Sequence, residues 1–137
     1  MIVGGDEGQF YYRLNMAQCL FSLEQFEEAL GYLPDSSSNT HYHHIIRRLE
    51  LKIYYERRSE LLDYKLDAFR KFIERTAPKS LAANIRTMHL NFLNILLQLA
   101  QSPMKDKTRS ARLIKRLDEK KLLADRAWLL EKAGELA

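Results

Sequence analysis

The sequence predicts an all-α fold, and three observations support this prediction. The residues that favour helices (Leu, Ala, Glu, Lys and Arg) dominate the composition, whereas valine occurs once. The 3 prolines fall between segments whose apolar residues recur at helical spacing. At 137 residues, with 46% hydrophobic and 29% charged residues, the chain has the length and balance of one globular domain with a core.

The first three helices are separated by clear stop and start signals. We expect helices at residues 9–23 and 25–33, the second ending before Pro34, because proline cannot donate a backbone hydrogen bond. The loop PDSSSNT is rich in helix-capping side chains, so a third helix is expected at residues 40–56. Its apolar positions share one helical stripe: Tyr42, Ile45, Ile46, Leu49 and Ile53.

Two longer helices are expected next. Ser59 can cap a helix at residues 60–76, and Ser80 is expected to open the longest helix, residues 80–101. The longest helix has apolar residues on two faces, which predicts that it is the most fully buried. The apolar stripe of the 60–76 helix is Leu62, Leu66, Phe69 and Ile73, widened by Leu61, Ala68 and Phe72.

Two shorter helices complete the chain, a basic one at residues 106–120 and a last one at residues 124–136. The residues of the basic helix expected to face inward are Ala111, Ile114 and Leu117. The residues of the last helix expected to be buried are Ala127, Leu130 and Ala133. Short connections make consecutive helices antiparallel, and no linker interrupts them, so we expect residues 1–137 to form a single domain of about seven helices.

Residues 11–34 carry a pattern of small and aromatic side chains typical of a tight helical hairpin. Ala17 and Ala29 allow the two helix axes to approach closely, Phe26 opens the second helix, and Pro34 closes the unit. This segment resembles a tetratricopeptide repeat. The resemblance implies antiparallel hairpins stacked as a right-handed superhelix. Glu24 departs from the family, which usually has glycine at this turn.

The rest of the chain matches this family less closely. About 35 residues further on the rhythm recurs, but Lys52 and Tyr64 occupy positions where small residues are expected, so an unrelated helical bundle is the alternative. The remainder resembles the tail of larger, uncharacterised bacterial helical-repeat proteins, which implies no function. We therefore expect that the chain can be a C-terminal fragment whose end face consists of Phe10, Tyr11 and Leu14.

The sequence contains no pattern typical of catalysis or of cofactor binding. His41 and His44 have a spacing that metals use, but no HExxH motif, nearby carboxylate or cysteine cluster accompanies them, so we predict no metal site. The single cysteine, Cys19, excludes an internal disulfide and is expected to be a buried, unreactive thiol. No glycine-rich phosphate loop occurs, so we predict no cofactor and no enzyme activity.

The two ends of the chain carry opposite charge. Residues 1–35 have a net charge of −5, and residues 102–121 have a net charge of +5. The basic helix carries a stripe of five bases: Arg109, Arg112, Lys115, Arg116 and Lys120. This stripe is suited to nucleic-acid phosphates. An ordinary solvated face is the other interpretation, because Asp118 and Glu119 interrupt the bases.

We predict a cytoplasmic protein without membrane contact, because no secretion signal and no apolar run of membrane-spanning length is found. The predicted function is a non-catalytic protein-interaction or scaffolding module that binds another protein or a peptide segment. The residues expected to line its groove are Tyr12, Asn15, Arg47 and Lys52. The alternatives are a nucleic-acid-binding module at residues 105–121 and a structural end segment of a longer solenoid, which self-associates through its exposed end face.

Overall fold

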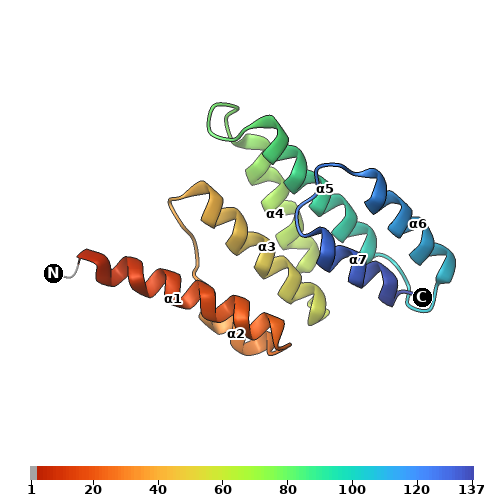
Figure 1. The fold of residues 1–137 in the computed structure, drawn as a ribbon, viewed down its shortest axis with the longest axis horizontal. Coiled ribbons are helices and arrows are strands. Elements are labelled where there is room, and N and C mark those ends of the chain that lie inside the picture. Colours follow the sequence, from red (N-terminus) through yellow and green to blue (C-terminus); the bar gives the residue numbers. More distant parts are fainter. Residues whose placement is uncertain (1–2) are drawn as a thin grey trace. The chain divides into compact units, whose positions relative to one another are not determined.

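The computed structural model describes residues 3–137 and, for the side chains, residues from Glu7 onward. This part of the chain is all-helical (Figure 1), which confirms the predicted fold class. Its helices are α1 (Val3–Ser22), α2 (Phe26–Tyr32), α3 (Thr40–Glu56), α4 (Leu62–Arg75), α5 (Ala83–Ala100), α6 (Lys107–Glu119) and α7 (Arg126–Glu135). None of these helices combines the length and the apolar character that crossing a bilayer requires.

The contacts divide the chain into two compact units, Met1–Lys65 and Leu66–Ala137. The division falls inside α4, which is one continuous helix. The prediction of a single domain stays a prediction.

Side-chain caps mark the starts of α3 and α6. The side chain of Asn39 accepts a hydrogen bond from the backbone N–H of Tyr42, which places the start of α3 at Thr40 as predicted. The side chain of Asp106 caps α6 in the same way. Ser80, in contrast, is part of a turn in which its N–H donates to Ala77, so α5 begins later than expected, at Ala83.

In the first unit, α1, α2 and α3 lie side by side (Figure 1), and their side chains form one apolar core. The core residues are Ala17, Leu20, Ala29, Leu49 and Ile53. Ala17 and Ala29 are completely buried, as expected for small residues where two helices touch. Phe26 packs against Phe21 with the ring centroids 5.4 Å apart, so the aromatic side chain fills the space beside the turn.

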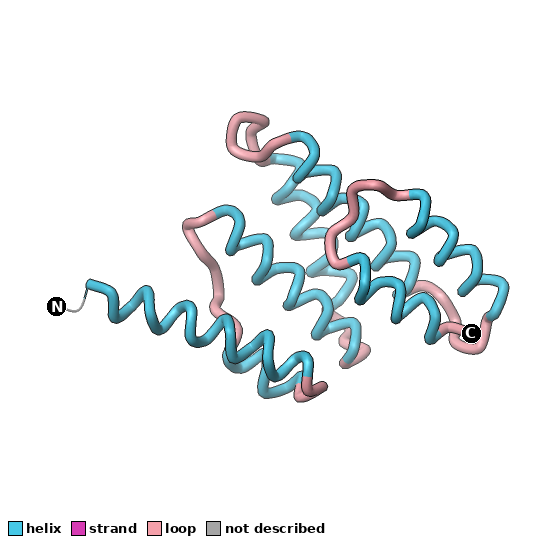
Figure 2. Tube along the Cα trace, viewed as in Figure 1, coloured by secondary structure: helices cyan, strands magenta, loops and turns pink. Residues whose placement is uncertain are grey.

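α1 and α3 each end in a short loop (Figure 2), and these two loops have the same hydrogen-bond pattern. After α1, Gln25 N–H donates to Leu20 and Glu24 N–H donates to Phe21; after α3, Ser59 and Arg58 repeat both bonds to Tyr54 and Tyr55. This is the Schellman motif, whose penultimate residue adopts a left-handed conformation. Glu24 and Arg58 do so, with φ of 60° and 52°, and lie 34 positions apart.

In the second unit, α7 packs against both α5 and α6. The core of α5 is formed by Phe92, Leu93, Ile95, Leu96 and Leu99. Two hydrogen bonds connect α7 to the start of α6: the buried Ser110 hydroxyl donates to the Ala133 carbonyl at 2.7 Å, and the Asp106 N–H donates to Leu136. These bonds give further donors to the carbonyls of Ala133 and of Leu136, the residue that follows α7.

Arginines from neighbouring helices bind the carboxyl ends of α2, α4 and α6. Arg13 donates to Gly31 at 2.6 Å, and Arg86 donates to Ile73 and Thr76. Arg126 donates to Leu117 and Lys120 in the same manner. A guanidinium at this position satisfies free carbonyls and interacts favourably with the helix dipole.

Several predicted faces were wrong by a fraction of a helical turn. The residues expected to widen the α4 stripe are exposed, with Leu61 and Phe72 53% and 40% exposed. In α6, Ala111 is exposed, and Ser110 and Leu113 are buried instead. In α7, Ala127 is exposed, whereas Leu129 and Lys132 are buried. The buried Ser110 and Lys132 have polar partners, which a pattern of apolar residues does not reveal.

Candidate functional site

The first unit contains a polar pocket of about 410 Å³ at the carboxyl end of α2. Its lining residues are Leu30, Leu33, Pro34, Asp35, Arg47, Glu50, Tyr54 and Lys65. Four of these eight residues are charged, so the pocket differs from a typical cofactor site, which is mostly apolar. The α3 residues in it recur at helical spacing, which places them on one side of the helix.

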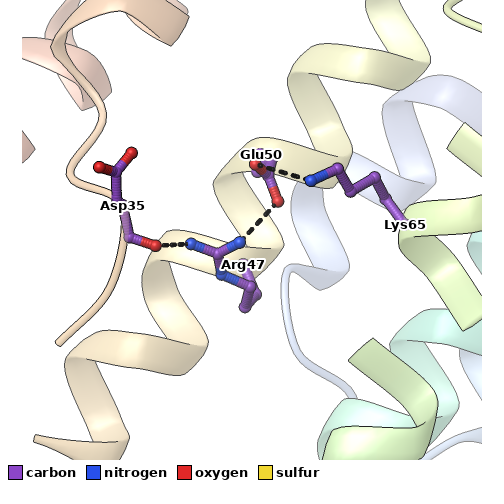
Figure 3. A network of polar contacts seen from close by, with 4 residues as sticks. All are labelled: Asp35, Arg47, Glu50 and Lys65. Atoms are coloured by element: carbon purple, nitrogen blue, oxygen red, sulfur yellow. Dashed lines mark hydrogen bonds and ion pairs between the residues drawn. The ribbon is translucent and has the colours of Figure 1, made fainter. Parts of the chain in front are cut away.

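Arg47 is the centre of a polar network in this pocket (Figure 3). Its guanidinium donates to a carboxylate oxygen of Glu50 at 3.0 Å and to the backbone carbonyl of Asp35. The ammonium of Lys65, at the start of α4, lies 3.9 Å from the other Glu50 oxygen. The side chains of Arg47 and Glu50 are 21% and 13% exposed, so both are largely removed from water.

The network positions the loop that follows α2. Arg47 binds this loop through Asp35, while Arg13, which is 34 positions earlier, binds the end of the same helix through Gly31. The two arginines therefore fix the carboxyl end of α2 from α1 and from α3. Holding the carboxyl end of α2 in place is a structural role that the network has with or without a ligand.

The four charged lining residues are two bases, Arg47 and Lys65, and two acids, Glu50 and Asp35. The carboxylate of Asp35 is directed away from the guanidinium of Arg47, as Figure 3 shows, and this residue is exposed. Because the Lys65–Glu50 separation exceeds a hydrogen-bond distance, the Lys65 ammonium can still donate hydrogen bonds to an anionic group.

The four residues predicted to line a groove lie in different surroundings. Arg47 lies in the pocket, whereas Lys52 lies over the ring of Phe21, with its ammonium 5.1 Å from the ring centroid. Tyr12 and Asn15 are exposed on α1. Only these last two residues lie together on one helix face.

Cys19 corrects another prediction. The thiol was expected to be buried, but Cys19 is exposed on α1 together with Tyr12 and Asn15. The buried side of α1 is formed by Leu14, Ala17 and Leu20 instead. The neighbouring helices cover α1 only on the side of these three residues. Cys19 lies on another side of the helix and therefore remains in contact with solvent.

The basic stripe of α6 is partly used within the chain. Arg109 donates to the Ser102 hydroxyl at 3.0 Å, and Arg116 donates to the side-chain oxygen of Gln98. Arg112 and Lys115 are exposed, and Lys120 is half-buried. Two of the five bases therefore bind Gln98 of α5 and Ser102, which follows that helix.

A second pocket, of about 570 Å³, lies between α5 and α6. Its lining residues are Asn94, Ile95, Leu97, Gln98, Arg116, Glu119 and Lys120. The two bases in it are accompanied by one acid, and Arg116 already binds Gln98. This pocket therefore presents less unpaired positive charge than the stripe suggested.

The histidines at the start of α3 lie in different environments. His44 is 2% exposed, and burial lowers its pKa to about 4, with the nearby His43, Arg48 and His41 acting in the same direction. Burial lowers the pKa of His43 as well, whereas His41 is exposed. The described side chains include no group of three or more metal-binding residues.

Sequence reasoning found Arg47 but missed Glu50 and Lys65. The spacing of Arg47 and Glu50 is that of an ion pair on a helix, so this contact could have been read from the sequence. The contact of Lys65 depends on how α4 follows α3, which no local pattern states.

Comparisons with known proteins do not assign this chain to a family. No family model, no curated protein and no solved structure matches it. The functional inference therefore depends on the geometry of the chain itself.

Proposed function

We propose that this chain is a cytoplasmic, non-catalytic protein-interaction module made of tetratricopeptide-like hairpins that stack as a right-handed superhelix. Two observations support the repeat architecture. The Schellman turns after α1 and α3 lie 34 positions apart, which is the length of a tetratricopeptide repeat. Ala17 and Ala29 are completely buried at the contact between α1 and α2. One cysteine and a helical surface rich in charges are consistent with the proposed location.

The partner in this proposal is a peptide segment with an acidic side chain or a free carboxyl end. The observation that carries it is the donor capacity of Lys65 in a pocket that also contains Arg47, with the Asp35 carboxylate directed away from that guanidinium. A carboxylate placed beside Lys65 and Arg47 gains charge-assisted hydrogen bonds in a site partly removed from water. The volume of about 410 Å³ suits a side chain or a chain end.

A peptide-display experiment tests this function. A library of peptides with free carboxyl ends is selected on the full chain, and the enriched peptides are measured on Lys65→Met and on the control Lys79→Met, which changes an exposed lysine elsewhere. We expect enrichment of acidic peptides and at least about tenfold weaker binding to Lys65→Met, equivalent to about 1.4 kcal/mol. Failure to enrich acidic peptides, or equal binding by both variants, would contradict the proposal.

The nucleic-acid alternative has less support, because Arg109 and Arg116 bind within the chain and Asp118 and Glu119 are exposed beside the remaining bases. A gel-shift titration at low salt distinguishes the two functions. Phosphate binding by α6 predicts a complex that weakens steeply with added salt and with Arg112→Ala. The protein-interaction proposal predicts no such complex.

A further inference from the structure

Two rows of polar side chains face each other across the pocket between α5 and α6. Asn94, Gln98 and Ser102 follow one another at intervals of four residues along α5 and the turn after it, so they share one side. Arg116 donates to Gln98, and Arg109 donates to Ser102, so bases of α6 face this row of neutral groups. We use the name α5–α6 groove for the pocket of about 570 Å³ between the two rows.

The bases at this groove keep their positive charge. The partners of Arg109 and Arg116 are a hydroxyl and an amide oxygen, so these hydrogen bonds orient the guanidinium groups without neutralising them. In the part of the chain whose side chains are described, neither arginine nor Lys120 forms an ion pair with an acid. Glu119 is the one acid that lines the pocket, which therefore holds more bases than acids.

Hydrogen bonds within α5 hold the neutral row in place. The side-chain amide of Gln98 donates to the Asn94 carbonyl at 3.2 Å, while its oxygen accepts from Arg116. The Ser102 hydroxyl donates to the Gln98 carbonyl and accepts from Arg109 Nε at 3.0 Å. Both guanidinium groups are therefore positioned before a ligand binds, which reduces the entropy lost on binding.

The lining of the groove favours an acidic peptide segment over nucleic acid. Arg116 and Lys120 lie about 6 Å apart along the axis of α6. Alternate side chains of an extended peptide are separated by about 7 Å, so two carboxylates can reach these two bases. Asn94 is exposed and offers an amide to a peptide backbone. The pocket has no aromatic ring on which a base could stack, and Glu119 would repel a phosphate.

We propose that the α5–α6 groove binds an extended acidic segment of another protein, with two carboxylates, two positions apart, at Arg116 and Lys120. The N–H groups of Arg116 that Gln98 does not use, and the ammonium of Lys120, form charge-assisted hydrogen bonds with these carboxylates. Arg109 lies about 10 Å further along α6 and can bind a third carboxylate. The inference rests on the proposed interaction function and adds a second binding surface, which uses no residue of the pocket at the carboxyl end of α2.

The end face expected from the sequence does not offer a comparable surface. Phe10, Tyr11 and Leu14 were predicted to form it, but Leu14 is 3% exposed. Phe10 and Tyr11 pack against Tyr42 of α3, with ring centroids 5.9 and 5.3 Å from that of Tyr42. These contacts correct the prediction, since the three side chains pack within the first unit.

An NMR titration of the isotope-labelled full chain tests the groove, with the side-chain amide signals of Asn94 and Gln98 as reporters. The probe is a short synthetic peptide that alternates glutamate and serine, and the control peptide has glutamine in place of glutamate. We expect saturable shifts of both reporters with the glutamate peptide alone. Its dissociation constant should rise at least about fivefold in Lys120→Met and less than about twofold in Lys115→Met, which removes an exposed base of α6 outside the groove.

Glu119→Gln tests the same charge effect in the opposite direction. Removing the one acid of the pocket should lower the dissociation constant of the glutamate peptide by about twofold to fivefold, with the backbone spectrum of the free chain otherwise unchanged. Absence of shifts at Asn94 and Gln98, or equal weakening by Lys115→Met and Lys120→Met, overturns the proposal. Tighter binding of a single-stranded oligonucleotide than of the peptide at the same reporters overturns it as well.

Lys65→Met separates this inference from the proposed function. Shifts at Asn94 and Gln98 that persist in Lys65→Met support the groove, whether or not the pocket at the carboxyl end of α2 binds the peptide. Shifts confined to that pocket, for example at Tyr54, and lost in Lys65→Met support the proposed function and overturn the inference about the groove.

Discussion

α1 and α3 are two versions of one helix in different surroundings. Each ends in a Schellman turn with a left-handed residue, and each supplies an arginine, Arg13 or Arg47, to the carboxyl end of α2. α3 is covered by α1 and α2 on a face that remains open on α1. The difference shows that the neighbour of a helix, as well as its own sequence, determines which residues are buried.

The composition of the two helices follows this difference. The covered face of α3 has Ile46, Leu49 and Ile53, whereas the corresponding positions of α1 have Tyr12, Asn15 and Cys19. Burial in a core selects fully apolar side chains, whereas a solvent-exposed face retains polar groups. This face of α1 therefore has the composition of a solvent-exposed surface and not of a core.

The largest expected effect is a loss of stability on truncating a buried residue of α3, compared with truncating the matching exposed residue of α1. Ile53→Ala should lower the free energy of unfolding by about 2 to 5 kcal/mol, because it leaves a cavity in the core between the helices. Cys19→Ala, at the matching position of α1, should change it by less than about 0.5 kcal/mol when the chain is monomeric. Urea denaturation at low protein concentration measures both values. Equal losses of unfolding free energy in the two variants would contradict the difference between α1 and α3.

Between pH 6.5 and pH 4, the dependence of stability on pH should come from α3 and not from the matching position of α1. His44 is buried with a pKa of about 4, below its ordinary value of 6.5, so the unfolded chain binds the proton more readily. The stabilising contribution is complete above pH 6.5 and is lost as the pH falls towards 4, by about 3 kcal/mol in total.

The matching residue of α1 is Phe10, which does not titrate. His44→Phe should therefore flatten the dependence of stability on pH between 6.5 and 4. Urea denaturation at several pH values checks this result, with His41→Phe, at an exposed position, as the control. An unchanged pH dependence in His44→Phe would show that other groups cause it.

The two arginines that fix α2 should make similar contributions. Arg13→Ala and Arg47→Ala each remove a charged donor from a backbone carbonyl, so each should cost about 1 to 3 kcal/mol. Arg112→Ala, at an exposed position of α6, should cost less than about 0.5 kcal/mol. Thermal denaturation of the three variants measures these losses of stability and ranks them. A loss confined to one of the two arginines would show that α1 and α3 do not fix α2 in the same way.

The smallest expected effect concerns the turns. Glu24→Gly and Arg58→Gly should each stabilise the chain by up to about 1 kcal/mol, because glycine removes the strain of a left-handed residue and offsets the greater entropy of the unfolded chain. Gln18→Gly, inside α1, should be destabilising by a similar amount and serves as the control. Destabilisation by both turn variants would contradict the described conformation.

The existence of each helix could be predicted from the sequence, because proline, caps and apolar spacing act locally. Asn39 illustrates this, since its side chain caps α3 within three residues of the chain. The inward faces of α6 and α7 could not be predicted in the same way. Ser110 is buried because its hydroxyl reaches Ala133, and Lys132 because its ammonium lies near Glu135 and over the Trp128 ring. The residue types alone do not predict these partners, because the fold brings them together.

The candidate site shows the same limit. Arg47 was found from its position in the first helix of a hairpin, but the pocket depends on Lys65 and on a backbone carbonyl of Asp35. Composition does not indicate which carbonyl an arginine will reach. The sequence showed a rhythm of about 35 residues but not the exact shift of 34, because Glu24 and Arg58 stand where glycine usually marks the turn.

The central claim is that α1 and α3 share one register, with the same face open on the first and covered on the second. Thiol reactivity tests it most directly, by comparing Cys19 in the wild-type chain with Ile53→Cys in a Cys19→Ala background, at submicromolar concentration. We expect Cys19 to react at least about 100-fold faster, because a thiol at residue 53 becomes accessible only after local opening. Similar rates for the two thiols would contradict the claim.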